Sequence, residues 1–420
     1  MKNCAKLVFC WSLLTFGLSV CSTIFAQDQA ASTLHTVLSD ALEHYLEIKM
    51  LEHKVEAAEF EVSSARQTIL PNVSYSGNDR FNSLYQSITS LKQPIFTFGR
   101  WRGDNRIART ELSLAETTLN FSKQDLLLTV LDSYHDLWRA DARSVVMSES
   151  VAEHQRLFDL ISRRVDAKKS PAVDQSLAKA RLEFARADLR TDLTAVEQIQ
   201  AQMAVFVGYR VEPSLWPDPG DLDFAFDTAL RDEVVANSER LKQSRIEREL
   251  LNARRLRAEV ELLPTVSLVF EKRKGYFEIG DPQDERTYLN LSYETGHGLS
   301  KREKIRAARQ RELAADIEID LIQASLIAEL DILVYRLKTA DGELERSGLL
   351  VESTNLVRES YLRQYTVGRK SWLDVMNASR EWFAARLQRI EWQKELGLTA
   401  WQIKTLSGEI SADGLSSSND

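Results

Sequence analysis

The chain has 420 residues, a formal net charge of -8 at pH 7, and only 16 glycines and 8 prolines. The acidic balance argues against nucleic acid as a partner. With so few turn-forming residues, the sequence has room for very long helices. All three cysteines, Cys4, Cys10 and Cys21, fall within the first 26 residues.

An apolar run follows a short basic start at the N-terminus, where Lys2 and Lys6 stand. This pattern predicts a signal peptide over residues 1–26, and its removal would take the charge to -10 and leave no cysteine. A membrane anchor is a weaker interpretation, because no basic stop-transfer cluster follows the run. Lipidation of Cys21 is also weaker, because Val20 stands where lipoprotein signals carry a small residue.

The first repeat is predicted to occupy residues 27–208. Apolar spacing predicts one helix over residues 32–70, which Pro71 ends. The spacing then changes to alternation, so strands are expected over about residues 72–96. A helical hairpin follows over about residues 101–206. Its first helix would be roughly 100 Å long, far longer than a globular domain requires.

A second repeat with the same order is predicted over residues 228–407. A linker rich in proline and acidic residues, 209–227, separates it from the first. Its opening helix is expected to run unbroken to Leu262, before strands over about residues 265–294 and a hairpin over about residues 301–406. The motif Leu-Pro-x-Val-Ser precedes the strands in both repeats. The polar tail, 408–420, is expected to be disordered.

The tips of the two predicted hairpins share their sequence spacing. One tip lies in Val165–Asp174 and the other in Tyr365–Ala378. In the second tip, Gly368 reads as a helix stop and Ser371 as the N-cap of the returning helix. These equivalent tips indicate a duplicated unit.

Membrane insertion, if it occurs, is expected to use the strands. After the leader, the sequence contains no stretch of ~18 consecutive apolar residues, whereas strands of about ten residues can cross a bilayer in a tilted barrel. Four strands cannot close a membrane barrel, for which about eight is the minimum. The chain must therefore assemble with copies of itself, and the pattern alone allows a dimer or a trimer.

The duplicated order resembles the TolC-like outer membrane efflux family over nearly the whole mature chain. The most specific part is Tyr365-x-Val367-Gly368-x-Lys370-Ser371-x-x-Asp374-Val375-Met376-Asn377-Ala378. This resemblance implies a mainly helical fold with a small β part: a homotrimer with a twelve-stranded outer membrane β-barrel continued by a twelve-helix periplasmic tunnel. It also places the linker in an equatorial collar.

The same resemblance implies an exit duct in a tripartite export system, with no enzymatic activity. Its partners would be outer membrane lipid, a periplasmic adaptor, and an inner membrane ABC transporter or proton-driven pump. Both type I protein secretion, for example of a large adhesin, and multidrug efflux fit the family. The sequence from Gly368 to Val375 looks more like the secretion-linked members.

Five residues are implied to form and gate the aperture at the tips. Asp174 would pair with Tyr365, and Lys370 would replace an arginine of the family in a second link. Asp374 would form a ring of carboxylates, which concentrates cations and can bind divalent ions. Asn377 replaces a second carboxylate. The alternative is that both aspartates only favour the positive ends of their helices.

The exposed tips are implied to dock an adaptor. The residues concerned are Val367, Gly368, Arg369 and Ser371 in the second tip and Lys168, Lys169 and Ser170 in the first. The first tip departs from the family pattern, because Asp166-Ala167 replaces its Val-Gly. Trp372 would act either as a docking anchor or as packing between helices.

Other functions explain the sequence less well. The six histidines are scattered, and neither a His-Glu-x-x-His motif, a nucleophile elbow nor a phosphate loop is present, so we expect no catalytic site, cofactor or metal. A periplasmic coiled-coil scaffold or adaptor without a barrel would explain the helices. It would not explain two strand pairs at equivalent places.

Overall fold

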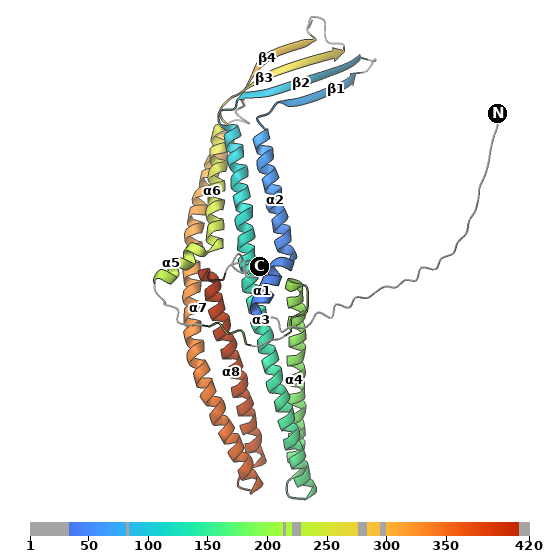
Figure 1. Ribbon diagram of the computed structural model, residues 1–420, viewed down its shortest axis with the longest axis vertical. Helices are drawn as coiled ribbons and strands as arrows, with labels where there is room; N and C mark the ends of the chain where they lie inside the picture. The colour runs from blue at the N-terminus through green and yellow to red at the C-terminus, as the bar shows by residue number, and fades with distance from the viewer. Residues whose placement is uncertain are drawn as a thin grey trace, which may run out of the picture.

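The computed structural model describes residues 33–80, 84–212, 216–220, 228–275, 284–294 and 300–410. The predicted signal peptide, part of the linker and residues 411–420 of the tail lie outside these residues. The molecule is elongated, with a sheet at one end and the turns of two helical hairpins at the other (Figure 1).

Two helix–strand–strand–long helix–return helix units follow one another along the chain, as the sequence predicted. The first comprises α1 (Leu34–His44), α2 (Leu46–Gln67), β1 (Asn72–Arg80), β2 (Leu84–Phe96), α3 (Arg100–Asp166) and α4 (Ala172–Val207). The second comprises α5 (Thr228–Asn237), α6 (Glu239–Val260), β3 (Thr265–Gly275), β4 (Glu285–Ser292), α7 (Ser300–Thr366) and α8 (Trp372–Ser407).

Each opening helix is interrupted, which corrects the expectation of one continuous helix per repeat. Tyr45 separates α1 from α2 with ψ of 120°, and Ser238 separates α5 from α6 with ψ of 110°. The Ser238 hydroxyl accepts a hydrogen bond from the Leu241 amide and so caps α6. Tyr45 has no such cap, but its ring packs edge-on against Phe206 of α4, 5.6 Å between centroids. Tertiary packing therefore fixes the first break and local capping the second.

The four strands form one antiparallel sheet in the order β1-β2-β3-β4, so the pairing of β2 with β3 joins the two repeats. The register places Val73 opposite Leu91, and Leu91 opposite Phe270. These side chains share one face and are exposed. The other face is polar: the hydroxyls of Ser74 and Ser90 lie 2.7 Å apart. Such alternation gives an open sheet with one apolar and one polar surface.

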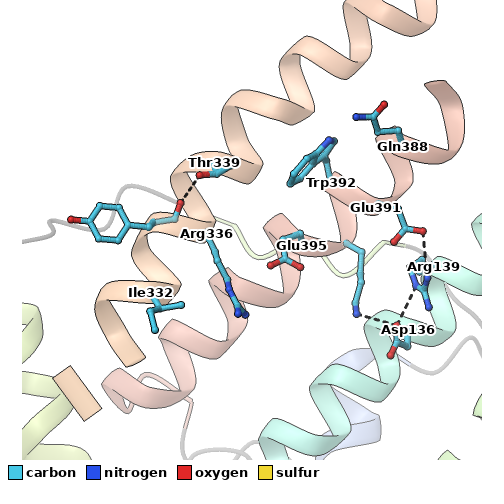
Figure 2. A pocket seen from close by; sticks show the side chains of 11 residues that line it. Asp136, Arg139, Ile332, Arg336, Thr339, Gln388, Glu391, Trp392 and Glu395 are labelled. Atoms are coloured by element: carbon cyan, nitrogen blue, oxygen red, sulfur yellow. Dashed lines mark hydrogen bonds and ion pairs between the residues drawn. The ribbon is translucent and has the colours of Figure 1, made fainter. Parts of the chain in front are cut away.

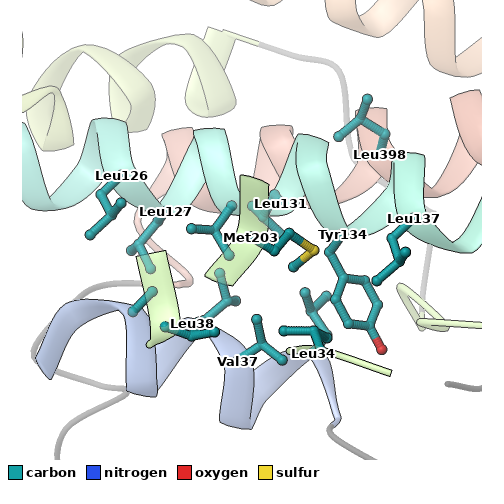
Figure 3. Packing of buried hydrophobic residues seen from close by; sticks show 14 of the residues in the cluster. Leu34, Val37, Leu38, Leu126, Leu127, Leu131, Tyr134, Leu137, Met203 and Leu398 are labelled. Carbon is teal, nitrogen blue, oxygen red and sulfur yellow. The ribbon is translucent and has the colours of Figure 1, made fainter. Parts of the chain in front are cut away.

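Each repeat has a hydrophobic core halfway along the molecule. In the first, Val37 and Leu38 of α1 pack with Leu127 and Leu131 of α3 and with Met203 of α4 (Figure 3). In the second, Val234 of α5 packs among Leu330 and Leu337 of α7 and Ile403 of α8. The short helices α1 and α5 thus widen the hairpins at their middle.

None of the described helices contains a stretch that is long and apolar enough to cross a membrane. The same residues contain no group of three or more histidine, cysteine, aspartate or glutamate side chains placed to hold a metal ion.

Candidate gating and docking site at the helical tips

The turns of the two hairpins have the same backbone. Lys168 and Gly368 both have positive φ, 55° and 77°. The amide of the next residue reaches back over the last turn: Lys169 donates to the Arg164 carbonyl at 2.8 Å, and Arg369 donates to the Gln364 carbonyl at 2.9 Å. These bonds satisfy carbonyls that a helix end otherwise leaves free. The first tip therefore has the turn of the second, although it lacks the glycine.

The returning helix of the second tip is fixed by a capping box. The Asp374 amide donates to the Ser371 hydroxyl at 3.2 Å, and the Asp374 carboxylate accepts from the Ser371 amide at 3.0 Å. The Ser371 hydroxyl also donates to this carboxylate at 2.8 Å. The hydrogen bonds from Ser371, helped by the charge of Lys370, lower the pKa of Asp374. Asp374 thus stabilises the start of α8 and is also charged at the tip.

Tyr365 lies where all four long helices converge. Only 5% of it is exposed, and it belongs to a cluster with Leu157, Ile161, Ala178, Trp372, Val375 and Met376. Its ring centre lies 5.4 Å from that of Trp372, and the Arg164 guanidinium lies 4.7 Å away. Trp372 is 3% exposed, so it packs between helices.

The polar neighbour of Tyr365 in this protomer is Ser170, whose hydroxyl oxygen lies 3.5 Å from the tyrosine hydroxyl. The predicted partner, Asp174, stands half-buried in the first turn of α4 and is not among the hydrogen-bond partners of Tyr365 in the described residues. A link between Asp174 and Tyr365 stays a prediction for the assembled channel.

The other predicted gating residues also lie at the second tip. The Lys370 ammonium sits 4.1 Å from the centre of the Tyr361 ring, so it binds an aromatic face of its own hairpin. Asn377 is half-buried one turn beyond Asp374 on α8.

The predicted docking residues lie on the outer surface of the turns. Val367 is 70% exposed, and Gly368, Arg369 and Ser371 beside it are exposed. In the first tip Lys168 and Lys169 are exposed. Ser170 is half-buried because it faces Tyr365. Both tips therefore present basic side chains to a partner.

Sequence reasoning missed a set of charged and aromatic residues that fastens the second hairpin to α3. We call Glu149, Glu153, Arg358, Trp382 and Arg386 the clamp. Arg358 donates to Glu153 at 3.2 Å, and its guanidinium lies 4.2 Å from the centre of the Trp382 ring. Arg386 covers the same ring at 5.0 Å and pairs with Glu149.

The carboxylate of Glu153 is only 14% exposed. Burial by itself would raise its pKa, but the hydrogen bond from Arg156 and the charges of Arg156 and Arg358 outweigh burial, and the net pKa is lowered. Because Glu153 stands 13 residues before the end of α3, the clamp lies roughly 20 Å above the tip. The spacing of Trp382 and Arg386, one helical turn apart, is the only local signal of it.

Further from the tips, a cavity of about 690 Å³ lies between α3, α7 and α8 (Figure 2). Its charged lining is balanced, with three acidic and three basic side chains. Several pair across the gap: Lys394 with Asp136 at 3.0 Å, and Arg139 with Glu391 at 3.4 Å. These pairs hold α8 against α3 below the middle of the molecule.

Comparison with known proteins gives a consistent result. Residues 37–208 match the model of the outer membrane efflux protein family. The chain is 18% identical over 336 residues to the outer membrane efflux protein BepC of Brucella suis, which covers 77% of this chain and 72% of BepC.

Two solved outer membrane channels share the fold. The CmeC channel of Campylobacter jejuni is 13% identical, with a TM-score of 0.78 over 96% of this chain and 94% of CmeC. The channel OprN is 17% identical, with a TM-score of 0.78 over 89% of each chain.

The expected resemblance is thereby confirmed. The family consists of channel-tunnels that lie in the outer membrane with a helical tunnel in the periplasm, and its members are not enzymes. They serve as exit ducts for efflux or secretion. The similarity to these channels implies a trimeric channel that works with adaptor proteins. Residues 37–208 match the outer membrane efflux protein family, and the described chain has the fold of its TolC-like channels.

Proposed function

We propose that the chain assembles as a homotrimeric duct that is gated at its helical tips, where a periplasmic adaptor docks and an inner membrane pump supplies the energy. The observation that carries this proposal is the cluster around Tyr365, which draws residues from α3, α4, α7 and α8 to one point.

Opening the entrance would require this cluster to separate. Fully burying a large apolar side chain contributes about 1.5–3 kcal/mol, so exposing Tyr365 and Trp372 together costs several kcal/mol. The clamp adds a partly buried ion pair and two cation–π contacts above the cluster. Closure is therefore the stable state of a lone channel, and a partner that binds the opened tips shifts the population.

The docking surface consists of the exposed turn residues. Since both turns have the same backbone, a trimer would present six similar tips, three from each repeat. Lys168, Lys169 and Arg369 make these tips basic, although the chain as a whole is acidic. Basic tips favour an adaptor with acidic groups at its own end.

The proposal extends to the cargo that the duct transports. The tip sequence from Gly368 to Val375 resembles that of secretion-linked members, which favours type I protein secretion. The similarity to BepC, named an efflux protein, favours efflux of small molecules as the second candidate. A duct passes whatever its pump delivers, so the inner membrane partner decides between the two.

Single-channel conductance in a planar bilayer tests the gate, with the oligomer mass measured on the same detergent-extracted sample. Changing Tyr365→Leu and Lys370→Gln together should raise the conductance several-fold. The matched control is Lys168→Gln, a charge loss at an exposed tip position, which should leave the conductance unchanged. A trimer whose conductance does not respond to the double change would remove Tyr365 and Lys370 from the gate. A water-soluble species with no conductance would favour the scaffold instead.

A further inference from the structure

A second cavity, of about 750 Å³, lies near the opposite end of the helices, between α2, α3 and α6. Four arginines line it, Arg66, Arg102, Arg106 and Arg109, against one acidic residue, Glu249. The cavity of Figure 2 has a balanced lining, whereas this one carries an excess of three positive charges.

Most of this charge has no partner within the protomer. Arg106 lies 3.6 Å from Glu249, with both side chains half exposed. Among the described residues, the side chains of Arg66, Arg102 and Arg109 have no ion pair or hydrogen bond. On α6, by contrast, Arg248 pairs with Asp316 at 2.8 Å and Arg255 with Glu312 at 2.6 Å. Arg248 and Arg255 thus have carboxylate partners, whereas Arg66, Arg102 and Arg109 of the cavity are exposed to solvent.

The position of the cavity points to the edge of the membrane. β2 ends at Phe96 and α3 begins at Arg100, so Arg102 to Arg109 lie within roughly 15 Å of the sheet. Side chains on a helix tilt toward its N-terminus, which for α3 is the end next to the sheet. The polar headgroup layer of a bilayer begins where the apolar face of the sheet ends.

Apolar and aromatic residues mark this boundary. Leu70, Ile95 and Phe96 at the base of the sheet are more than half exposed. Trp101 lines the cavity, and its indole N–H donates to the Arg66 carbonyl at 3.3 Å. Tryptophan is enriched at membrane–water interfaces, where its ring contacts acyl chains and its N–H a polar group. The cavity is thus bordered by lipid-compatible surface on the side of the sheet.

We infer that this cavity binds a phosphate group, and that its source is the headgroup of a phospholipid in the periplasmic leaflet or free inorganic phosphate. Planar guanidinium groups form paired hydrogen bonds with phosphate oxygens, and several converging arginines neutralise a phosphodiester. Because the cavity lies outside the tips, binding there would anchor the helical part to the membrane without taking part in gating.

Native mass spectrometry of the full-length, detergent-extracted trimer tests this inference. The probes are dihexanoyl phosphatidylglycerol, inorganic phosphate, and dihexanoylglycerol, which lacks the phosphate. The test variant combines Arg102→Gln with Arg109→Gln. The matched control combines Arg248→Gln with Arg255→Gln, which removes the same charge from paired arginines. Trimer mass and conductance verify that both variants assemble.

We expect phosphatidylglycerol to bind the wild-type trimer and dihexanoylglycerol not to. Because the test variant removes charged hydrogen bonds to the phosphate, it should weaken binding roughly tenfold or more, and the control less than about twofold. Inorganic phosphate that binds as tightly as the lipid would assign the site to the free anion. Binding of neither phosphate probe, or equal loss in both variants, would overturn the inference.

Discussion

Lys168 and Gly368 occupy the same position in the two tips and share a left-handed backbone, with φ of 55° and 77°. The left-handed conformation costs a residue with a Cβ about 1–2 kcal/mol, and glycine almost nothing. The first tip therefore places a lysine in the left-handed backbone conformation, which glycine adopts at the second tip without a steric penalty.

Gly368→Ala should destabilise the second tip by about 1 kcal/mol, although no atom within 4 Å would meet the added Cβ. The control is Gly348→Ala inside α7, which also meets no atom and should stabilise the helix by about 0.5–1 kcal/mol. Hydrogen exchange at the tip amides measures the first change, and exchange at the amides around Gly348 measures the second. Equal effects of the two alanines would contradict a backbone cause.

The clamp should behave as one coupled unit. In a double-mutant cycle, Glu153→Gln and Arg358→Gln should show a coupling energy of about 1–3 kcal/mol, because the two charges meet in a partly buried site where water screens them weakly. Arg306 and Glu303 form an exposed ion pair one turn apart and should couple by less than about 0.5 kcal/mol. Denaturant unfolding supplies the free energies. Coupling in the clamp no larger than in the exposed pair would show that the ion pair does not hold the hairpin.

Asp374 can be tested for its charge apart from its capping role. Asp374→Asn keeps an oxygen that can accept from Ser371 but removes the carboxylate charge, so block of single-channel current by divalent cations should weaken while stability changes little. Asp374→Ala should weaken the block and also lower stability, because it removes the acceptor of the capping box. If divalent cations block the current of both variants as strongly as that of the wild type, Asp374 acts only in the capping box.

His135 should make the stability of the molecule depend on pH. It is fully buried, its Nδ1 lies 2.7 Å from the Leu131 carbonyl oxygen, and Trp216 packs edge-on against it. Burial, with the charge of Lys394, lowers its pKa from 6.5 to about 4, against the opposing hydrogen bond to the Leu131 carbonyl and the charge of Asp136. Below pH 6.5 the unfolded chain binds a proton that the folded chain does not. Stability should therefore fall between pH 6.5 and pH 4, by roughly 3 kcal/mol.

His135→Phe should flatten this part of the pH profile, measured as the free energy of unfolding at several pH values. His53→Gln, a change at an exposed histidine, should keep the wild-type slope. A slope that persists in His135→Phe would assign the pH dependence to other groups.

The order of elements could be read from the sequence because proline and glycine mark the ends of the long helices. The motif Leu-Pro-x-Val-Ser precedes a strand pair in each repeat, and both pairs enter the one sheet. The break at Tyr45 could not be read, because the contact that supports it joins residues far apart in sequence. The break at Ser238 has a capping serine, but the helical pattern continues on both sides of it.

The candidate site was only partly predictable. The turns, the cap at Ser371 and the exposure of Val367 follow from local chemistry. The clamp does not, because Glu153 and Arg358 are separated by 205 residues and each looks like surface charge on its own helix. The packing of Trp372 likewise depends on helices that only the fold brings together.

The strand order β1-β2-β3-β4 has a consequence for cells that make a defective copy of this chain. Each subunit offers two free sheet edges, one on β1 and one on β4, and a ring closes only when every edge meets a neighbour. A subunit with a damaged β4 edge can still join through β1 and would act as a chain terminator. If damaged and intact subunits are equally abundant and mix at random, only about one trimer in eight would be sound. Such an allele would be dominant even though the intact copy is made normally.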